Sequence, residues 1–216
     1  MSNEFLNTHY YMLSVAVIII ACTVFLLGFE KRKPQTREIV TLAVMSAIAV
    51  AARAAFMIIP FFKPMTGIII ITGMAFGPGA GFLTGTVSAF VSNFIFGQGP
   101  WTPWQMFAYA MAGLLAGVLY KCNVIHERKR VQTSVVGFSL VVLIVGPILD
   151  VCSVFTMGGK ISWEYVISMF ASGLIPNIIH GAATFVTLFL LCKPMMEKLN
   201  RMKVKYGMMS EEEDEI

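Results

Sequence analysis

Long apolar stretches, separated by short polar segments, run through most of this chain of 216 residues. A helix needs about 20 mainly apolar residues to cross the hydrocarbon core of a bilayer. Stretches of suitable length predict membrane-spanning helices over residues 10–29, 39–59, 80–97, 103–120, 133–156 and 164–192. One shorter apolar run, residues 66–76, cannot be assigned by length alone.

The basic residues decide whether this short run crosses the membrane. Thirteen of the sixteen Lys and Arg fall in three clusters, within residues 31–37, 121–130 and 193–205. Lys and Arg near helix ends are retained on the cytoplasmic side, and the three clusters share a side only if residues 66–76 also cross. We therefore expect an all-α polytopic inner-membrane protein with seven spans, its N-terminus outside and its C-terminus cytoplasmic.

The composition agrees with a membrane protein and argues against several other classes. Hydrophobic residues make up 57% of the chain and charged residues 13%, with a mean hydropathy of +0.76. This is more apolar surface than a soluble chain of this length can bury, so the lipid bilayer must cover the excess. The net charge of +4 sits at span ends without a basic-aromatic surface pattern, so we expect no nucleic-acid partner. The four Cys stand alone, without CxxC or clustered His, and we expect no metal or other cofactor.

The two ends of the chain differ from its centre. The run over residues 10–29 lacks a basic region before it and a small-residue cleavage site, which favours a retained helix over a signal peptide. We expect residues 1–35 to form an extra N-terminal helix with a basic linker, 36–195 a six-helix core, and 196–216 a charged cytoplasmic tail. The acidic run at 211–215 is typical of a solvated segment.

Small residues recur at every fourth position in two places. In lipid, close approach of helix backbones at such stripes is a main source of association. The spacing alone allows packing within the bundle or docking of another protein. The first stripe is Ala43, Ala47, Ala51 and Ala55, and the second is Gly73, Gly77, Gly81, Gly85 and Ala89.

A few polar residues lie inside the predicted spans and are candidates for function. A charge at the centre of a membrane helix costs about 2.5 to 3.5 kcal/mol on insertion scales, so such residues are rarely incidental. On the expected topology these residues lie in the outer halves of their spans or near the middle, which indicates an outward-facing cavity. They are Arg53, Asn93, Asp150, Asn177 and His180.

Each of these residues also has a structural interpretation. Arg53 and Asp150 could form a buried ion pair or reach the outer surface, and a lone His180 is more often a helix-helix contact than a ligand. Trp101 and Trp104 bracket a Thr-Pro pair in one outer loop, and Trp163 lies in another. Tryptophan at these places indicates either an interfacial aromatic belt or a surface on which a ligand stacks.

Several catalytic chemistries can be argued against. The chain has no GxxxxGK[ST] loop, no HExxH and no GxSxG motif. Asp150 is the only acidic residue well inside a span, so a proton-driven carrier is not indicated either. We assign no catalytic residue, and a transporter of this kind needs energy from a partner.

At this point the residues resemble a known family, the substrate-binding S components of energy-coupling factor (ECF) vitamin transporters of prokaryotes. The likeness covers residues from Thr36 to about 195. It rests on Ala43-xxx-Ala47 in the first core helix, on Gly77-Pro78-xx-Gly81-xxx-Gly85-xx-Ser88 entering the third, and on six core spans with both ends cytoplasmic.

The resemblance implies a capture protein with an outward-opening pocket formed by the later helices and capped by outer loops. It also implies docking through Ala43, Ala47 and Ala51 on a transmembrane coupling subunit, which works with two cytoplasmic ATPases. The S component is thought to topple in the membrane to release substrate. The extra helix at 10–29 departs from the usual six spans and leaves open how freely the first core helix docks.

The segment Phe96–Met106 looks like a loop of S components of the cobalamin and corrinoid group, which makes cobalamin the expected cargo. Neutral donors would suit the amide arms of a corrinoid, and riboflavin or a thiamin precursor would suit them nearly as well. The expected substrate-binding residues are Arg53, Asn93, Gln98, Trp101, Trp104, Gln105, Asp150 and Asn177.

Two rival interpretations stay open. A membrane scaffold would use the Ala and Gly stripes without binding a small molecule. An intramembrane enzyme would use His180 or Asp150, although no second catalytic group can be assigned.

Overall fold

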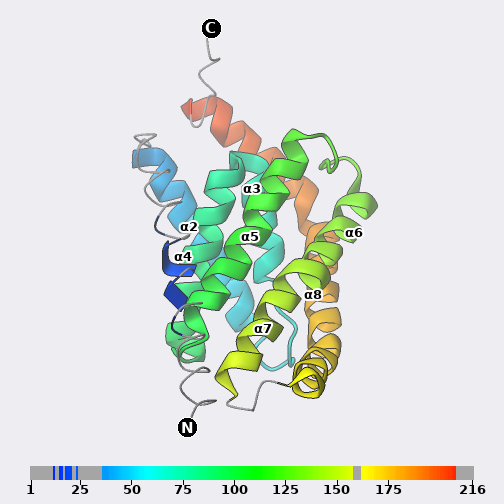
Figure 1. The fold of residues 1–216 in the computed structure, drawn as a ribbon. Helices are drawn as coiled ribbons and strands as arrows, with labels where there is room; N and C mark the ends of the chain where they lie inside the picture. Colours follow the sequence, from blue (N-terminus) through cyan, green and yellow to red (C-terminus); the bar gives the residue numbers. More distant parts are fainter. Residues whose placement is uncertain are drawn as a thin grey trace, which may run out of the picture.

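The computed structural model describes residues 36–157 and 162–207, together with seven positions between 12 and 23. This part of the chain is helical and contains no strand. Six helical segments run between two opposite ends of the molecule, as predicted for the core (Figure 1). The helices are α2 (Thr36–Ala55), α3 (Met65–Phe76), α4 (Pro78–Phe96), α5 (Thr102–Lys121), α6 (Arg130–Leu140), a π-helical turn (Val141–Val145), α7 (Gly146–Thr156) and α8 (Trp163–Tyr206).

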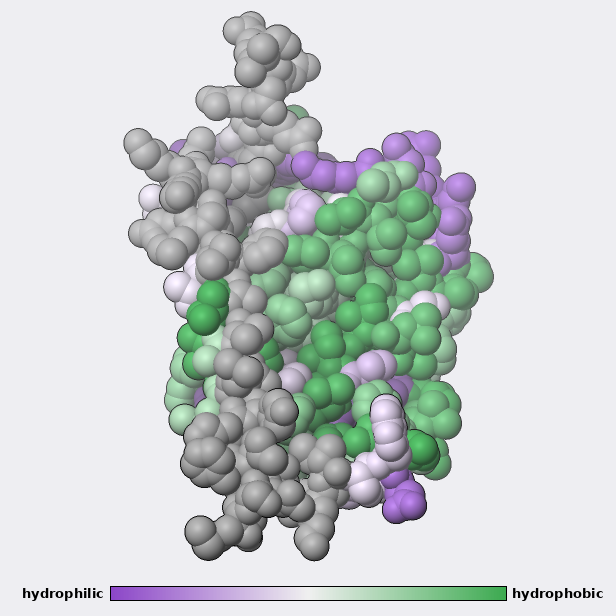
Figure 2. All heavy atoms as spheres, viewed as in Figure 1, coloured by the Kyte–Doolittle hydropathy of each residue, from purple (hydrophilic) through white to green (hydrophobic). Residues whose placement is uncertain are grey.

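Most of these segments are long and apolar enough to span a bilayer. By length and composition, those that can cross a membrane are α2, α4, the continuous segment Arg130–Thr156 and α8. The π-helical turn and Pro147 lie inside the Arg130–Thr156 segment without ending it. Figure 2 shows a surface that is hydrophobic over most of its height and hydrophilic along its upper edge.

The short helix α3 lies at the centre of the bundle. All twelve of its residues are buried, and it contacts α2, α4, α5 and α8. A helix covered by protein on every side needs no full-length apolar surface toward lipid, which explains how so short a run crosses between the two ends. It ends at Gly77, whose φ of 91° suits glycine, and Pro78 starts α4 at once.

Glycines bring α3, α4 and α5 into backbone contact. A Cβ atom added to Gly81 would lie 2.4 Å from the carbonyl oxygen of Gly113, and one added to Gly73 would lie 2.2 Å from the same oxygen. A Cβ on Gly85 would meet the carbonyl oxygen of Tyr109 at 2.4 Å. The second small-residue stripe is therefore used for packing inside the bundle.

The last helix continues beyond the predicted end of its span at residue 192. Helix α8 has 44 residues, which makes it about 66 Å long at the usual helical rise. Beyond Pro194 it runs obliquely across one end of the bundle (Figure 1), and the guanidinium of Arg37 lies 5.7 Å from the ring centre of Tyr206. Met196 and Leu199 are buried there, so packing carries the helix on until Gly207.

The predicted N-terminal helix at 10–29 falls largely outside the described residues. Its seven described positions are helical. Among them Ile18 is buried in a cluster with Phe82, Trp104 and Ala110, on α4 and α5.

Candidate functional site

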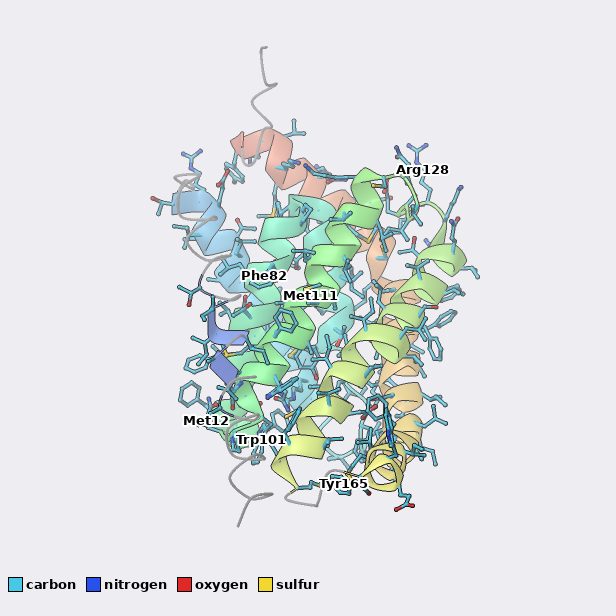
Figure 3. All side chains as sticks on the ribbon, in the orientation of Figure 1. Met12, Phe82, Trp101, Met111, Arg128 and Tyr165 are labelled. Atoms are coloured by element: carbon cyan, nitrogen blue, oxygen red, sulfur yellow. The ribbon has the colours of Figure 1, made fainter. Side chains whose placement is uncertain are left out.

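The two ends of the bundle carry different residues. Trp101 and Tyr165 lie at one end and Arg128 at the other (Figure 3). We call the end with Trp101 and Tyr165 the tryptophan end and the end with Arg128 the basic end. Buried Ser and Thr hydroxyls occur along the whole interior of the described helices. The buried charged, amide and imidazole side chains lie in the half near the tryptophan end or close to the middle of the bundle, and they are Arg53, Asn93, Asp150, Asn177 and His180.

Arg53 connects α2 to α4. Its Nη1 group donates hydrogen bonds to Ser92 Oγ and, over 3.1 Å, to Asn93 Oδ1. The guanidinium carbon lies 4.3 Å from the ring centre of Phe96, at a distance suited to a cation-π contact. Arg53 is 7% exposed, so its charge is held almost entirely inside protein.

The same network reaches the loop between α4 and α5. Asn93 Nδ2 donates to Thr102 Oγ1 over 3.2 Å, and Thr102 Oγ1 donates to Gln98 Oε1 over 2.8 Å. Gln98 Nε2 donates to the Phe90 carbonyl over 3.1 Å. The side chains of Asn93 and Gln98, expected to offer hydrogen bonds to a ligand, are thus engaged in tying this loop to α2 and α4.

Asp150 and Asn177 form a second group, between α7 and α8. Asn177 Nδ2 donates to Asp150 Oδ2 over 2.8 Å. Two glycines make room for the pair, because a Cβ on Gly173 would lie 2.1 Å from Asp150 Oδ1 and one on Gly146 2.5 Å from Asn177 Cγ. Arg53 and Asp150, which the sequence left as possible partners, have separate partners instead.

His180 belongs to a third group, in the middle of the bundle. One of its ring nitrogens, Nε2, lies 2.7 Å from the hydroxyl oxygen of Thr66 on α3. The ring of Tyr109 on α5 packs edge-on against it, with 5.8 Å between ring centres.

Three neighbouring positions on α5 carry buried polar atoms without a hydrogen-bond partner in the structure. They are Trp104 Nε1, Gln105 Oε1 and the hydroxyl of Tyr109. Leaving such an atom buried and unpaired costs on the order of 1 to 3 kcal/mol, so native proteins usually satisfy it with water or a ligand. Gln105 and Tyr109 are four residues apart and share one face of the helix, and that face meets His180.

The remaining predicted residues lie nearer the surface of the tryptophan end. The ring of Trp104 stacks on Phe155 with 6.1 Å between centres, whereas Trp101 is 40% exposed. Trp101 therefore belongs to the rim of the molecule, and Trp104 to its interior.

Sequence reasoning missed Thr66 and Tyr109 as members of the group around His180. Thr66 and Tyr109 sit in apolar helices and are fully buried, so their sequence pattern is that of ordinary core residues. Their contacts with His180 on α8 identify them as members of this group. No local signal in the sequence could have predicted these contacts.

The alanine stripe of α2 behaves differently from the glycine stripe. Ala43, Ala47 and Ala51 lie on the exposed face of α2, beside Val44 and Ile48, which are 52% and 42% exposed. The smooth face that they form is not used for packing by the described residues.

These features define a helical membrane protein that buries charged and amide side chains toward one end of its interior. A family model of the ECF-type riboflavin transporter S component matches residues 33–197. The chain therefore belongs to this family and is a substrate-binding subunit of an ECF transporter in a prokaryotic membrane, rather than an enzyme. Comparisons with curated proteins and with solved structures gave no match.

Proposed function

We propose that this subunit captures riboflavin, or a vitamin with a similar flat heterocyclic ring, from outside the cell. The observation that carries the proposal is the set of unpaired buried atoms of Trp104, Gln105 and Tyr109 on α5, of which Tyr109 packs against His180. The family description supports the choice of ring, since it names riboflavin.

A flat heterocycle suits these groups chemically. Its faces are apolar and its edges carry hydrogen-bond donors and acceptors, so aromatic walls with a few placed polar groups can hold it. In our proposal Gln105 and Tyr109 bind one edge of the ring. Asn177, held by Asp150, binds another edge, and Trp104 closes the tryptophan end.

Delivery into the cell requires partners. We assign the exposed stripe of Ala43, Ala47 and Ala51 to docking on the coupling subunit, because small residues let two helices approach closely in lipid. Two cytoplasmic ATPases supply the energy, and the tryptophan end faces outward, with the N-terminus outside and the C-terminus in the cytoplasm. The positive residues of the basic end support this orientation.

A corrinoid such as cobalamin is the second candidate, favoured by the loop Phe96–Met106 and the exposed ring of Trp101. Two of the neutral donors expected for it, Asn93 and Gln98, are engaged within the protein. The unpaired atoms lie deep, beside the fully buried Tyr109. The flat ring of a flavin is narrower than a corrin ring. It therefore reaches these atoms with a smaller displacement of the helices than a corrin requires.

The test is to identify what copurifies with the detergent-solubilised protein, by mass spectrometry and visible absorbance, and then to titrate the emptied protein with riboflavin and with cobalamin. We expect stoichiometric, saturable binding of riboflavin and weaker or no binding of cobalamin. The reverse order would assign the corrinoid. Absence of saturable binding for either vitamin would favour a scaffold without a ligand.

A further inference from the structure

Arg53 carries a buried positive charge without a negative partner among the described residues. Its hydrogen bonds go to the neutral side chains of Ser92 and Asn93, and no described carboxylate forms an ion pair with it. Buried charges in proteins are normally paired, because removal from water is otherwise costly. In a membrane protein that cost is higher still.

Other charges near Arg53 do not balance it. Lys63, in the loop that follows Arg53 and leads into α3, is also basic and is partly buried. The one buried carboxylate among the described residues is Asp150, and its hydrogen-bond partner is Asn177. The interior near the tryptophan end therefore has an excess of positive charge, which attracts anions.

The guanidinium of Arg53 also has hydrogen-bonding capacity left. Its hydrogen bonds to Ser92 and Asn93 both use Nη1, and Nε and Nη2 have no acceptor among the described residues. An arginine held at one end by protein and free at the other can bind two oxygens of a phosphate or carboxylate at once.

The geometry points to an anion-binding position at Arg53 and Lys63, so that the substrate class extends to vitamins bearing a phosphate monoester or a carboxylate. This inference rests on the proposed function, because it places the anionic group of the ligand beside the ring position on α5. Arg53 binds the anion directly, and Lys63 adds a second, more exposed charge.

The test compares riboflavin with riboflavin 5′-phosphate on the full-length protein in lipid nanodiscs, by equilibrium titration at low and high salt. At low salt we expect the phosphate ester to bind about tenfold more tightly, as suits a charge-assisted hydrogen bond. Raising the salt concentration should shrink this ratio only in part, since salt screens the more exposed charge of Lys63 but screens the buried Arg53 much less. Equal affinities at both salt concentrations would overturn the inference while leaving riboflavin capture intact.

Variants separate the charge of Arg53 from its role in the fold. Arg53→Gln should abolish the preference for the phosphate ester, and Lys63→Gln should reduce it by about threefold, as expected for a more exposed charge. Ser92→Ala is the matched control, because it removes a hydrogen bond of Arg53 but keeps the charge, and the preference should survive. A preference lost in Ser92→Ala but kept in Lys63→Gln would contradict charge recognition.

A further experiment tests the anion position even if neither riboflavin nor riboflavin 5′-phosphate binds. Inorganic phosphate should then raise the melting temperature of the wild-type protein, raise that of Lys63→Gln less, and leave that of Arg53→Gln unchanged. That outcome would retain the anion position while rejecting riboflavin as the cargo. No effect of phosphate on any of these proteins would reject both.

Discussion

The two halves of the bundle interior are built in opposite ways. Toward the basic end, Gly73, Gly81 and Gly113 bring helix backbones into direct contact. Nearer the tryptophan end, α2, α5 and α8 carry buried polar side chains, among them Arg53, Tyr109 and His180. The first half is packed through backbone contacts, with unpaired hydroxyls only at small side chains such as Thr84 and Ser134, whereas the second holds the unpaired groups of the large side chains Trp104, Gln105 and Tyr109.

This difference indicates that the two halves of the bundle, one after the other along the membrane normal, have different roles. Backbone contacts through glycine make a half that cannot move its helices apart without losing packing. In our proposal, the unpaired groups of Gln105 and Tyr109 are satisfied by the ligand. A binding region supported on a rigid base suits a subunit that must hold its cargo while it docks on a partner.

The largest effect should come from disrupting the glycine contacts in the half toward the basic end. Gly81→Leu places a side chain where the Gly113 carbonyl lies, so we expect a loss of stability on the order of 3 kcal/mol or more, with little folded protein recovered. Size-exclusion profiles and thermal unfolding in detergent would show this. Ala51→Leu adds similar bulk on the exposed face of α2 and is the control, and it should leave the melting temperature nearly unchanged. Equal loss in both variants would show that the glycine contacts are not special.

The next effect concerns the exposed stripe rather than either half. Ala47→Trp should prevent copurification of the coupling subunit and stop transport, because a bulky ring holds the two helices apart. Ligand affinity should stay close to that of the wild type, since Ala47 points away from the interior. A matching loss of ligand affinity would refute the docking assignment.

Within the polar half, removal of single groups should have smaller effects. Tyr109→Phe deletes one hydroxyl and keeps the ring against His180, so we expect riboflavin to bind about tenfold more weakly, with no loss of stability in the ligand-free protein because the hydroxyl is unpaired there. Gln105→Ala should act in the same direction. Fluorescence quenching of the flavin measures both. Unchanged affinity in Tyr109→Phe would show that its hydroxyl is satisfied by something other than the ligand.

The smallest effect is expected at the rim. Trp101 is partly exposed, so Trp101→Ala should reduce the capture of riboflavin by no more than about fivefold, mainly through faster release. Stopped-flow measurement of dissociation tests this. A loss exceeding that of Tyr109→Phe would move the ligand toward the loop and favour the larger corrinoid.

The sequence predicts the architecture well because charges and apolar length act locally. The basic clusters, together with the length of each run, led to the correct number of core segments, including the short α3. The same information could not predict the tertiary partners. Nothing near Arg53 in the sequence indicates that it binds Ser92 and Asn93 rather than Asp150.

The site was predicted only in its outline. The concentration of polar residues near the tryptophan end follows from where they fall within each span. Tyr109 and Thr66 enter the site because α3, α5 and α8 meet at His180, which is a property of the packed bundle. The continuation of α8 through Tyr206 likewise depends on packing of Met196 and Leu199, although the local composition is charged.

The most direct test of the account is an experimental structure of this subunit with riboflavin bound. We predict that the ring lies in the half near the tryptophan end, with the Tyr109 hydroxyl and Gln105 Oε1 within hydrogen-bond distance of its edge. A ring bound at the basic end, or one that leaves both atoms unpaired, would contradict the proposed capture site.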